Sequence, residues 1–302
     1  MKAFIHFFLF LFYLSPLVSF AGVTEWVDFK LENGHIKVPV KIEGIDTFAI
    51  LDTGAQLNAI NKAFVGKHDL SFNKGGKVRI DGVFGEQVIN KFNGIGISIF
   101  GVDMELDGAP PIALGHHSNG LLLGSGFFSQ FIVQIDYPNS RLRVLTRDVM
   151  NLSEFENIRA ESQRGSGEPL VRVSLGNDDS FWALLDTGNN GGVIIERSYA
   201  KSLGLIDKVT SSSMAMGATS VAVTESTRVP EFVFGPYTLE NVLVSFPAEG
   251  QSIVIEKQSS ISGTHRKSQK QQGILGYDIL KHFVLTMDYA KGQVHIGLPE
   301  EG

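Results

Sequence analysis

Apolar residues along most of this chain either alternate with polar residues or form short continuous runs, and turn residues separate these segments. Segment 37–44 alternates, and segment 78–92 alternates about Gly82 and Gly85, as a hairpin does, whereas 48–51 and 181–185 are continuous apolar runs. Alternation with a period of two is typical of strands with one buried face, and short apolar runs are typical of fully buried strands. A helical pattern is confined to short segments such as 196–205. The sequence therefore predicts a mostly β fold.

Two halves of the chain carry the same strand pattern. The segment KVPVKIEG, followed by TFAILDTG, matches LVRVSLGN, followed by SFWALLDTG, in the second half. In both copies two strands joined by a turn run into Asp-Thr-Gly, and 134 residues separate Asp52 from Asp186. This spacing is far longer than a solenoid repeat, so the match indicates a duplicated domain.

A second shared block follows Asp-Thr-Gly in each half. Each copy reads as an apolar run, a glycine, a short helix, a buried strand, an Asp-Tyr turn and a final strand. The glycine precedes the aspartate by 12 residues in both copies, Gly124 before Asp136 and Gly276 before Asp288. Pro-Asn-Ser and Ala-Lys-Gly follow the Asp-Tyr pairs and are typical hairpin-turn residues, so we interpret these two aspartates as structural.

The two repeats define two homologous lobes. The segment between them is polar and contains Gly-Ser-Gly, and we place the boundary near residue 153. This gives an N-terminal lobe at 22–153 and a C-terminal lobe at 154–302. Segment 156–162 is predicted as the first strand of the second lobe, because it stands where 27–33 stands in the first.

Two segments stand outside the repeats. The first 21 residues begin with Lys2, continue through an apolar run and end on the small residues Ser19 and Ala21, which predicts a secretory signal peptide; an uncleaved membrane anchor is the alternative. No later stretch of the sequence is apolar for long enough to cross a bilayer, so we expect an exported protein, in the periplasm or cell envelope or secreted. A Ser-, Gln- and Lys-rich stretch at about 251–272 reads as a surface insertion that lengthens the second lobe.

Composition and charge exclude several classes of function. The chain has 302 residues, 43% of them hydrophobic, and 26 Lys and Arg against 32 Asp and Glu give a net charge of −6, without the basic surplus of a nucleic-acid-binding protein. The absence of Cys excludes disulfides, thiol nucleophiles and zinc–thiolate sites. The neighbouring His116 and His117 are expected to point to opposite sides of an extended loop, with no acidic cluster nearby, so we expect neither a metal nor a cofactor.

Paired Asp-Thr-Gly tripeptides carry a specific chemistry. Two aspartates brought together beside apolar surface cannot both ionise at low cost, so they share one proton. The ionised carboxylate can take a proton from a bound water while the protonated carboxyl donates to the carbonyl under attack. The hydroxyls of Thr53 and Thr187 can cross-link the two loops, and Gly54 and Gly188 allow the two backbones to approach closely.

The two copies of Asp-Thr-Gly, each followed by an apolar-apolar-Gly block (LLLG and GILG), resemble the aspartic protease family of pepsins and retropepsins. The resemblance extends over nearly the whole chain after the signal segment. It implies an all-β fold of two retropepsin-like lobes with the active-site cleft between them, and a catalytic dyad of Asp52 and Asp186. The residues that it implies for support of the active-site loops are Thr53, Gly54, Thr187 and Gly188. Two covalently linked lobes complete the dyad within one chain, which implies a monomer.

The chain departs from the pepsin pattern at several positions. Pepsins carry Ser or Thr after Asp-Thr-Gly, whereas this chain has Ala55 and Asn189. Loss of a hydroxyl donor removes a hydrogen bond that favours the charged carboxylate, so we expect a working pH less acidic than that of pepsin. The resemblance implies a β-hairpin flap over the substrate, and the hairpin expected at 78–92 is the candidate. It offers Phe84 and Gly85 where pepsins present a tyrosine, and Met216 is the candidate cleft residue of the second lobe.

The sequence thus predicts an exported aspartic endopeptidase that hydrolyses peptide bonds by a water molecule activated between Asp52 and Asp186. Its partner would be a peptide or protein substrate, with no nucleic acid, no metal, no cofactor and no stable membrane span once the signal segment is cleaved. Two alternatives share both aspartates: a non-catalytic peptide-binding protein on the same scaffold, and a selective processing protease of the cell envelope.

Overall fold

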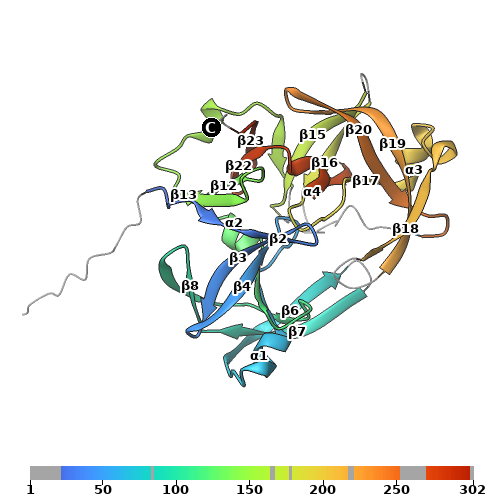
Figure 1. Ribbon diagram of the computed structural model, residues 1–302. Coiled ribbons are helices and arrows are strands. Elements are labelled where there is room, and N and C mark those ends of the chain that lie inside the picture. The colour runs from blue at the N-terminus through green and yellow to red at the C-terminus, as the bar shows by residue number, and fades with distance from the viewer. Residues whose placement is uncertain are drawn as a thin grey trace, which may run out of the picture.

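The computed structural model describes residues 22–82, 85–163, 167–176, 179–216, 221–251 and 270–299 (Figure 1). The expected signal segment and residues 252–269 of the expected insertion lie outside the described residues. Strands dominate the part of the chain that is described, and its longest α-helices have 6 residues. Within that part, no helix is long and apolar enough to span a bilayer.

The elements follow one another in two comparable series. Those of the first half are β1 (Val27–Asp28), β2 (Lys30–Glu32), β3 (His35–Ile42), β4 (Ile45–Leu51), β5 (Ala59–Asn61), α1 (Lys62–Lys67), β6 (Asn73–Gly82), β7 (Gly85–Asn93), β8 (Ile95–Ile99), β9 (Val102–Leu106), β10 (Pro111–Ile112), β11 (Asn119–Leu123), α2 (Ser125–Phe128), β12 (Ile132–Asp136) and β13 (Arg141–Leu145). Those of the second half are η1 (Leu152–Glu154), β14 (Ala160–Ser162), β15 (Pro169–Leu175), β16 (Asp179–Leu185), β17 (Val193–Ile195), α3 (Arg197–Ser202), η2 (Ile206–Lys208), β18 (Ser211–Met216), β19 (Val221–Phe234), β20 (Tyr237–Pro247), β21 (Gln271–Leu275), α4 (Tyr277–Leu280), β22 (Val284–Asp288) and β23 (Gln293–Gly297).

Each half forms its own large sheet. The strand order is β10-β5-β11-β4-β3-β8-β9 in the first, where β2 also pairs with β3, and β14-β15-β16-β21-β17-β20-β19-β18 in the second. The repeated sequence blocks take equivalent places: β3 and β4 form a hairpin as β15 and β16 do, and β4 pairs in parallel with β11 as β16 does with β21. The predicted all-β fold of two lobes is confirmed.

A third sheet joins the two halves. Its order is β1-β13-β12-β22-β23, so three strands come from the first half and two from the second. The central contact is the antiparallel pair β12–β22, in which Ile132 faces Asp288 and Asp136 faces Val284. The two Asp-Tyr blocks therefore lie side by side, and each contributes a strand hairpin to a common layer.

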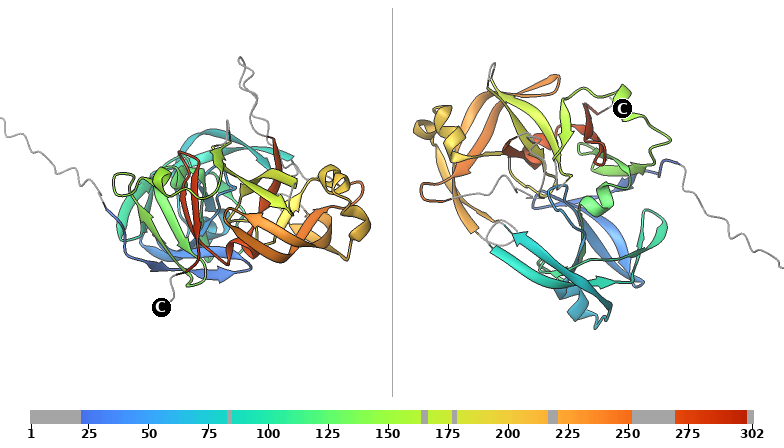
Figure 2. Two further views of the ribbon diagram at one scale, coloured as in Figure 1. Left: turned by 90° about the horizontal axis from the view of Figure 1, so that it is seen from above. Right: turned by 180° about the vertical axis from the view of Figure 1, so that it is seen from behind.

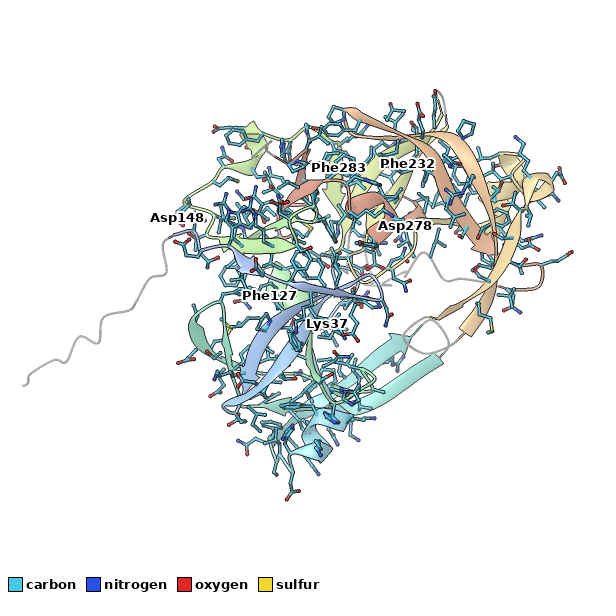
Figure 3. All side chains as sticks on the ribbon, viewed as in Figure 1. Lys37, Phe127, Asp148, Phe232, Asp278 and Phe283 are labelled. Atoms are coloured by element: carbon cyan, nitrogen blue, oxygen red, sulfur yellow. The ribbon has the colours of Figure 1, made fainter. Side chains whose placement is uncertain are left out.

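Large aromatic side chains fill a core that continues from one half into the other. Phe127, Phe232 and Phe283 are all buried within it (Figure 3). Phe128 of α2 stacks on Tyr289, which follows β22, with ring centroids 6.0 Å apart. Burial of such side chains stabilises the fold by about 1.5–3 kcal/mol each. The shared core holds the two halves in a fixed relation.

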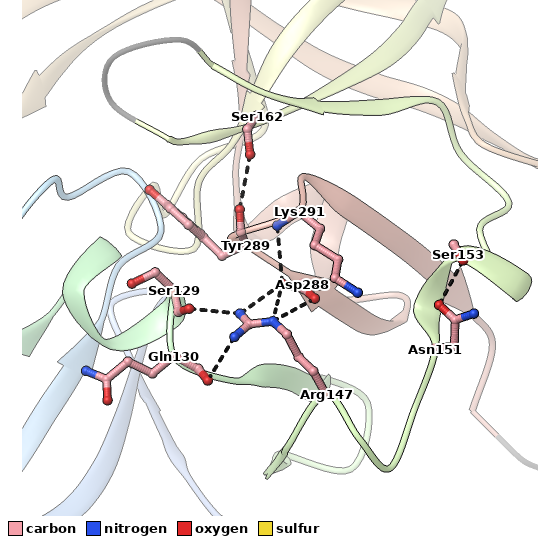
Figure 4. Close-up of polar contacts among 9 residues, drawn as sticks. All are labelled: Ser129, Gln130, Arg147, Asn151, Ser153, Ser162, Asp288, Tyr289 and Lys291. Carbon is pink, nitrogen blue, oxygen red and sulfur yellow. Dashed lines mark hydrogen bonds and ion pairs between the residues drawn. The ribbon is translucent and has the colours of Figure 1, made fainter.

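Arg147 ties the ends of several elements together where the two halves meet (Figure 4). Its Nε lies 2.9 Å from Oδ2 of the buried Asp288, and its Nη2 lies 3.0 Å from Oδ1. The same guanidinium donates to the carbonyls of Ser129 and Gln130, at the end of α2. Asp136, the equivalent of Asp288, accepts hydrogen bonds from Arg141 and from the turn backbone at 139. Both aspartates thus have the structural roles predicted for them.

Two long hairpins extend from the lobes. The hairpin β6–β7 pairs Gly82 with Gly85, as the alternating pattern predicts, and β18–β19 pairs Met216 with Val221. Figures 1 and 2 show that they extend toward the same side of the molecule. Each lobe therefore contributes one hairpin to that side.

Two local predictions differ from the structure. The predicted first strand of the second lobe is present, but within segment 156–162 it spans only Ala160–Ser162, because the Asn157 side chain exchanges hydrogen bonds with the backbone of Ile296 in place of a ladder. His116 and His117 do not point apart: their ring centroids lie 4.0 Å from each other, because the segment turns here instead of running extended.

Candidate active site

Asp52 and Asp186 stand at equivalent points of the two lobes. Each follows the last residue of a buried strand, β4 for Asp52 and β16 for Asp186. The backbone N–H of Asp52 donates to Leu123 and that of Asp186 to Leu275, both at 3.0 Å. The parallel neighbours β11 and β21 thus fix the start of each loop in the same way.

The two threonines that follow lock the loops to each other. The Thr53 hydroxyl donates to the Leu185 carbonyl at 2.6 Å and accepts from the Thr187 N–H at 3.0 Å. Reciprocally, the Thr187 hydroxyl donates to the Leu51 carbonyl at 3.0 Å and accepts from the Thr53 N–H at 3.1 Å. Both side chains are buried, so all four bonds are shielded from water. The cross-linking predicted for this pair is present.

The glycines of the two tripeptides face the opposite carboxyl groups. A Cβ on Gly54 would lie 2.7 Å from Cγ of Asp186, and a Cβ on Gly188 would overlap the carboxyl of Asp52. Each glycine N–H also donates to the aspartate of its own loop, Gly54 to Asp52 at 2.9 Å and Gly188 to Asp186 at 2.8 Å. A side chain at either position would collide with the opposite carboxyl group. The two glycines therefore allow the two carboxyl groups to lie close together.

The two carboxyl groups influence each other's ionisation. Loss of hydration in the half-buried site raises the pKa of Asp186 well above its ordinary value, and the charge of Asp52 raises it further. The hydrogen bond from the Gly188 N–H opposes this shift without cancelling it. Because Asp186 holds a proton at a pH where an ordinary aspartate is ionised, the site can contain a general acid beside a carboxylate.

The second shared block supports these loops from behind. A Cβ on Gly124 would collide with the carbonyls of Ala55 and Leu57, and a Cβ on Gly276 would lie 2.5 Å from the Asn189 carbonyl. The short helices α2 and α4 begin directly after these glycines. The second motif therefore packs against the residue that follows each Asp-Thr-Gly.

Asn189, the departure from the pepsin pattern, turns toward its own loop. Its Oδ1 accepts from the Gly191 N–H at 3.0 Å, and its backbone N–H donates to the Asp186 carbonyl at 3.2 Å. The equivalent backbone bond from Ala55 to Asp52 is also 3.2 Å. The asparagine thus keeps the loop conformation of the other lobe while its side chain rests on Gly276.

Sequence analysis missed two ionisable residues next to the dyad. The registers of β3–β4 and β15–β16, continued by one residue pair, place His35 across from Asp52, and by two pairs place Glu168 across from Asp186. His35 is half-buried and Glu168 is buried. The repeat contained the signal, because Gly34-His35 precedes the first copy as Gly167-Glu168 precedes the second.

A buried tyrosine also reaches the site from behind. The Tyr289 hydroxyl donates to the Thr53 carbonyl at 3.3 Å, and so links the Asp-Tyr turn of the second lobe to the Asp-Thr-Gly loop of the first. Burial raises the pKa of Tyr289, and the charges of Glu168, Asp52 and Asp186 raise it further. Tyr289 therefore stays protonated and acts as a donor.

The candidate flap residues are described only in part. Phe84 lies outside the described residues, and Gly85 and Met216 are described by their strand pairing alone. Their role over the substrate stays a prediction. Within the described ranges no group of three His, Asp or Glu side chains could hold a metal ion.

Comparison with known families bears on the second repeat. Residues 171–279 match the family model of aspartyl proteases, a range that begins in β15, includes Asp186 and ends just beyond Gly276. A comparison with curated proteins found no match to the chain. The matched segment is the copy that contains one Asp-Thr-Gly and its supporting glycine, and the first half repeats the same arrangement around Asp52.

Proposed function

We propose that the protein is an exported aspartic endopeptidase in which Asp52 and Asp186 activate the attacking water. The aspartyl protease match over 171–279 supports a protease hydrolase acting on peptides. The observation that carries the finer proposal is the reciprocal threonine exchange between the two Asp-Thr-Gly loops, because it holds two carboxyl groups side by side within one chain.

The proposed reaction needs only the two carboxyl groups and water. The ionised carboxylate takes a proton from the water, whose oxygen attacks the carbonyl carbon of the peptide bond. The protonated carboxyl donates its proton to the carbonyl oxygen, which gives a neutral tetrahedral diol. Collapse of the diol breaks the C–N bond as the nitrogen is protonated, and one proton is left on the dyad. Each step conserves the total charge of the site.

We propose two retropepsin-type lobes, at 22–153 and 154–302, joined in a monomer. The equivalent sheets, the equivalent active-site loops and the pairing of β12 with β22 support this arrangement. One hairpin from each lobe would act as a flap over an extended substrate, with Phe84, Gly85 and Met216 near the tips. The N-terminal segment 1–21 would direct export to the periplasm, the cell envelope or the medium.

The residues that follow the two Asp-Thr-Gly tripeptides lead us to expect a working pH above that of pepsin. Neither Ala55 nor Asn189 supplies the hydroxyl that donates to the carboxylate in pepsins. Burial and the charge of Asp52 raise the pKa of Asp186 as well, which favours a working pH in the same direction. We expect activity to peak at a pH above about 3.

The proposal is tested by incubating the protein with a diverse library of denatured peptides between about pH 3 and pH 7. Wild type, Asp52→Ala and Asp186→Ala are compared, with the exposed Asp207→Ala as the control variant. We expect cleavage by wild type and Asp207→Ala and none by the other two. Binding of peptides by wild type without cleavage would replace the protease by a peptide-binding protein.

A further inference from the structure

The backbone around the two aspartates is nearly symmetric, but the charged side chains next to them differ between the lobes. The aligned repeats place His35 in the first lobe where Glu168 stands in the second. Each is preceded by a glycine with positive φ, 79° at Gly34 and 75° at Gly167. The same turn thus leads into the same strand in both lobes, and presents an imidazole beside one aspartate and a carboxyl group beside the other.

Glu168 is held close to Asp186. Its carbonyl accepts from the Gln163 N–H at 2.7 Å, and its neighbour Gly167 lies against the ring of Tyr289. With 3% of its surface exposed, Glu168 is far less screened by water than a surface carboxylate. Its negative charge raises the pKa of Asp186, in addition to the effects of burial and of Asp52.

His35 is held close to Asp52. The preceding turn is fixed because a Cβ on Gly34 would lie 2.6 Å from Cβ of Asn190, in the active-site loop of the other lobe. Burial lowers the pKa of His35, the charge of Asp52 raises it, and the neighbouring Lys37 lowers it. By reciprocity, a protonated His35 favours the ionised form of the Asp52 carboxyl.

The other described groups near the two aspartates do not reverse this asymmetry. Lys37 forms an ion pair with Glu32 at 2.8 Å. Tyr137 and Tyr289 are buried, and burial together with the charge of Asp186 raises the pKa of both, so they stay neutral. Among the residues that the structure describes, the charged side chains that distinguish the two aspartates are therefore His35 and Glu168.

We propose that Glu168 and His35 are positioning residues that make the two aspartates unequal, so that Asp186 carries the shared proton and Asp52 carries the negative charge. Under the proposed function, on which the catalytic part of this inference rests, Asp186 is then the general acid and Asp52 the general base of the first step. The division of roles comes from His35, the first residue of β3, and from Glu168, which directly precedes β15, since the two Asp-Thr-Gly loops make the same hydrogen bonds.

Carboxyl titration by NMR tests the assignment independently of any activity. The chain is labelled with ¹³C at aspartate side chains, and Asp52→Asn and Asp186→Asn identify the two signals. We expect the signal of Asp186 to titrate at the higher pH, and Glu168→Gln to lower that pH by on the order of 1 unit, because the variant removes a buried negative charge beside Asp186. His35→Gln should move the step of Asp52 to higher pH.

Glu161→Gln is the matched control, because it removes a carboxylate from the neighbouring strand β14. Glu161→Gln should leave the titrations of Asp52 and Asp186 unchanged. If Glu168→Gln does not fold, the order of the two titrations in wild type still tests the assignment. A higher titration pH for Asp52 than for Asp186, or a Glu168→Gln profile that coincides with wild type, would overturn the inference. Peptide cleavage is measured separately: loss of the proposed function would appear there as no cleavage, whatever the NMR titration gives.

In the pH profile of kcat/KM, the alkaline limb reports loss of the general acid. We expect Glu168→Gln to move this limb to lower pH by the same amount as the titration of Asp186. A uniform fall in kcat/KM with an unmoved profile would show a merely structural role for Glu168.

Discussion

Gln134 and Thr286 face each other at the midpoint of the β12–β22 pair, and the Gln134 amide donates a hydrogen bond of 2.9 Å to the Thr286 hydroxyl. The two residues occupy the same position of the repeated block, as do Asp136 and Asp288. Only a two-fold relation between the lobes makes equivalent residues face each other in this way. The same relation brings the Asp-Thr-Gly loops into contact, so one symmetric strand pair helps to set the geometry of the candidate site.

The exchange between Thr53 and Thr187 should contribute to stability and activity together. Thr53→Val leaves the Leu185 carbonyl and the Thr187 N–H unpartnered in a buried place, at a cost of about 2–4 kcal/mol in the free energy of unfolding. Thr53→Ser keeps the hydroxyl and should cost about 1 kcal/mol. Urea denaturation and peptide cleavage measure both effects. Equal losses for Val and Ser would mean that the hydroxyl bonds do not hold the loops.

Gly188 should tolerate no side chain, because the added methyl group overlaps the Asp52 carboxyl. We expect Gly188→Ala to lower kcat/KM by about 100-fold or more, since the carboxyl group must move out of place. Gly66 lies exposed in α1, where a Cβ meets nothing within 4 Å, so Gly66→Ala is the control and should keep full activity. Full activity of Gly188→Ala would place the reacting groups elsewhere.

The raised pKa of Asp186 has a defined effect on stability. Above the pKa of an unfolded aspartate, about 4, the native state binds more protons than the unfolded state, so the free energy of unfolding falls as pH rises toward the native pKa. Asp186→Asn removes this penalty, so its free energy of unfolding should exceed that of wild type at neutral pH, and the difference should be smaller at about pH 3. The exposed Asp207→Asn should show no such dependence. An Asp186→Asn variant that is less stable than wild type at neutral pH contradicts the shift.

Of the two arginines that bind the Asp-Tyr turns, Arg147 should contribute more to the free energy of unfolding. Its partner Asp288 is buried, and Arg147→Met removes the opposite charge and leaves Asp288 with a long backbone hydrogen bond from the Lys291 N–H at 3.3 Å, so we expect a cost of about 3–5 kcal/mol. Asp136 keeps its bonds from Asn139 when Arg141 is removed, so Arg141→Met should cost about 1–2 kcal/mol. Chemical denaturation of both variants gives the comparison. The reverse order would mean that the Arg147 contact does not join the lobes.

Much of the candidate site was predictable because it is repeated in the sequence. The two Asp-Thr-Gly tripeptides, the glycines Gly124 and Gly276 and the structural aspartates recur with fixed spacing, and the structure places them at equivalent points. Strand alternation similarly predicted the hairpin β6–β7. Repetition and local periodicity are visible in one sequence without any knowledge of distant contacts.

Contacts between segments far apart in the sequence were not predictable. The bond from Tyr289 to the Thr53 carbonyl joins residues 236 positions apart, and the contact of Gly34 with Asn190 crosses between the lobes. Nothing in local composition marks such partners. The wrong strand limit at 156–162 has the same origin, because the Asn157 side chain bonds to a strand near the C-terminus.

The kcat/KM of Asp52→Asn, Asp186→Asn and the double variant on the best-cut peptide tests the central claim most directly. The account predicts that each single substitution lowers kcat/KM by on the order of 10⁴-fold and that the double variant is no worse, because the two carboxyl groups act as one unit. Thermal unfolding of all three confirms that they are folded. Losses that multiply in the double variant, or a single variant that retains activity, would contradict a shared dyad.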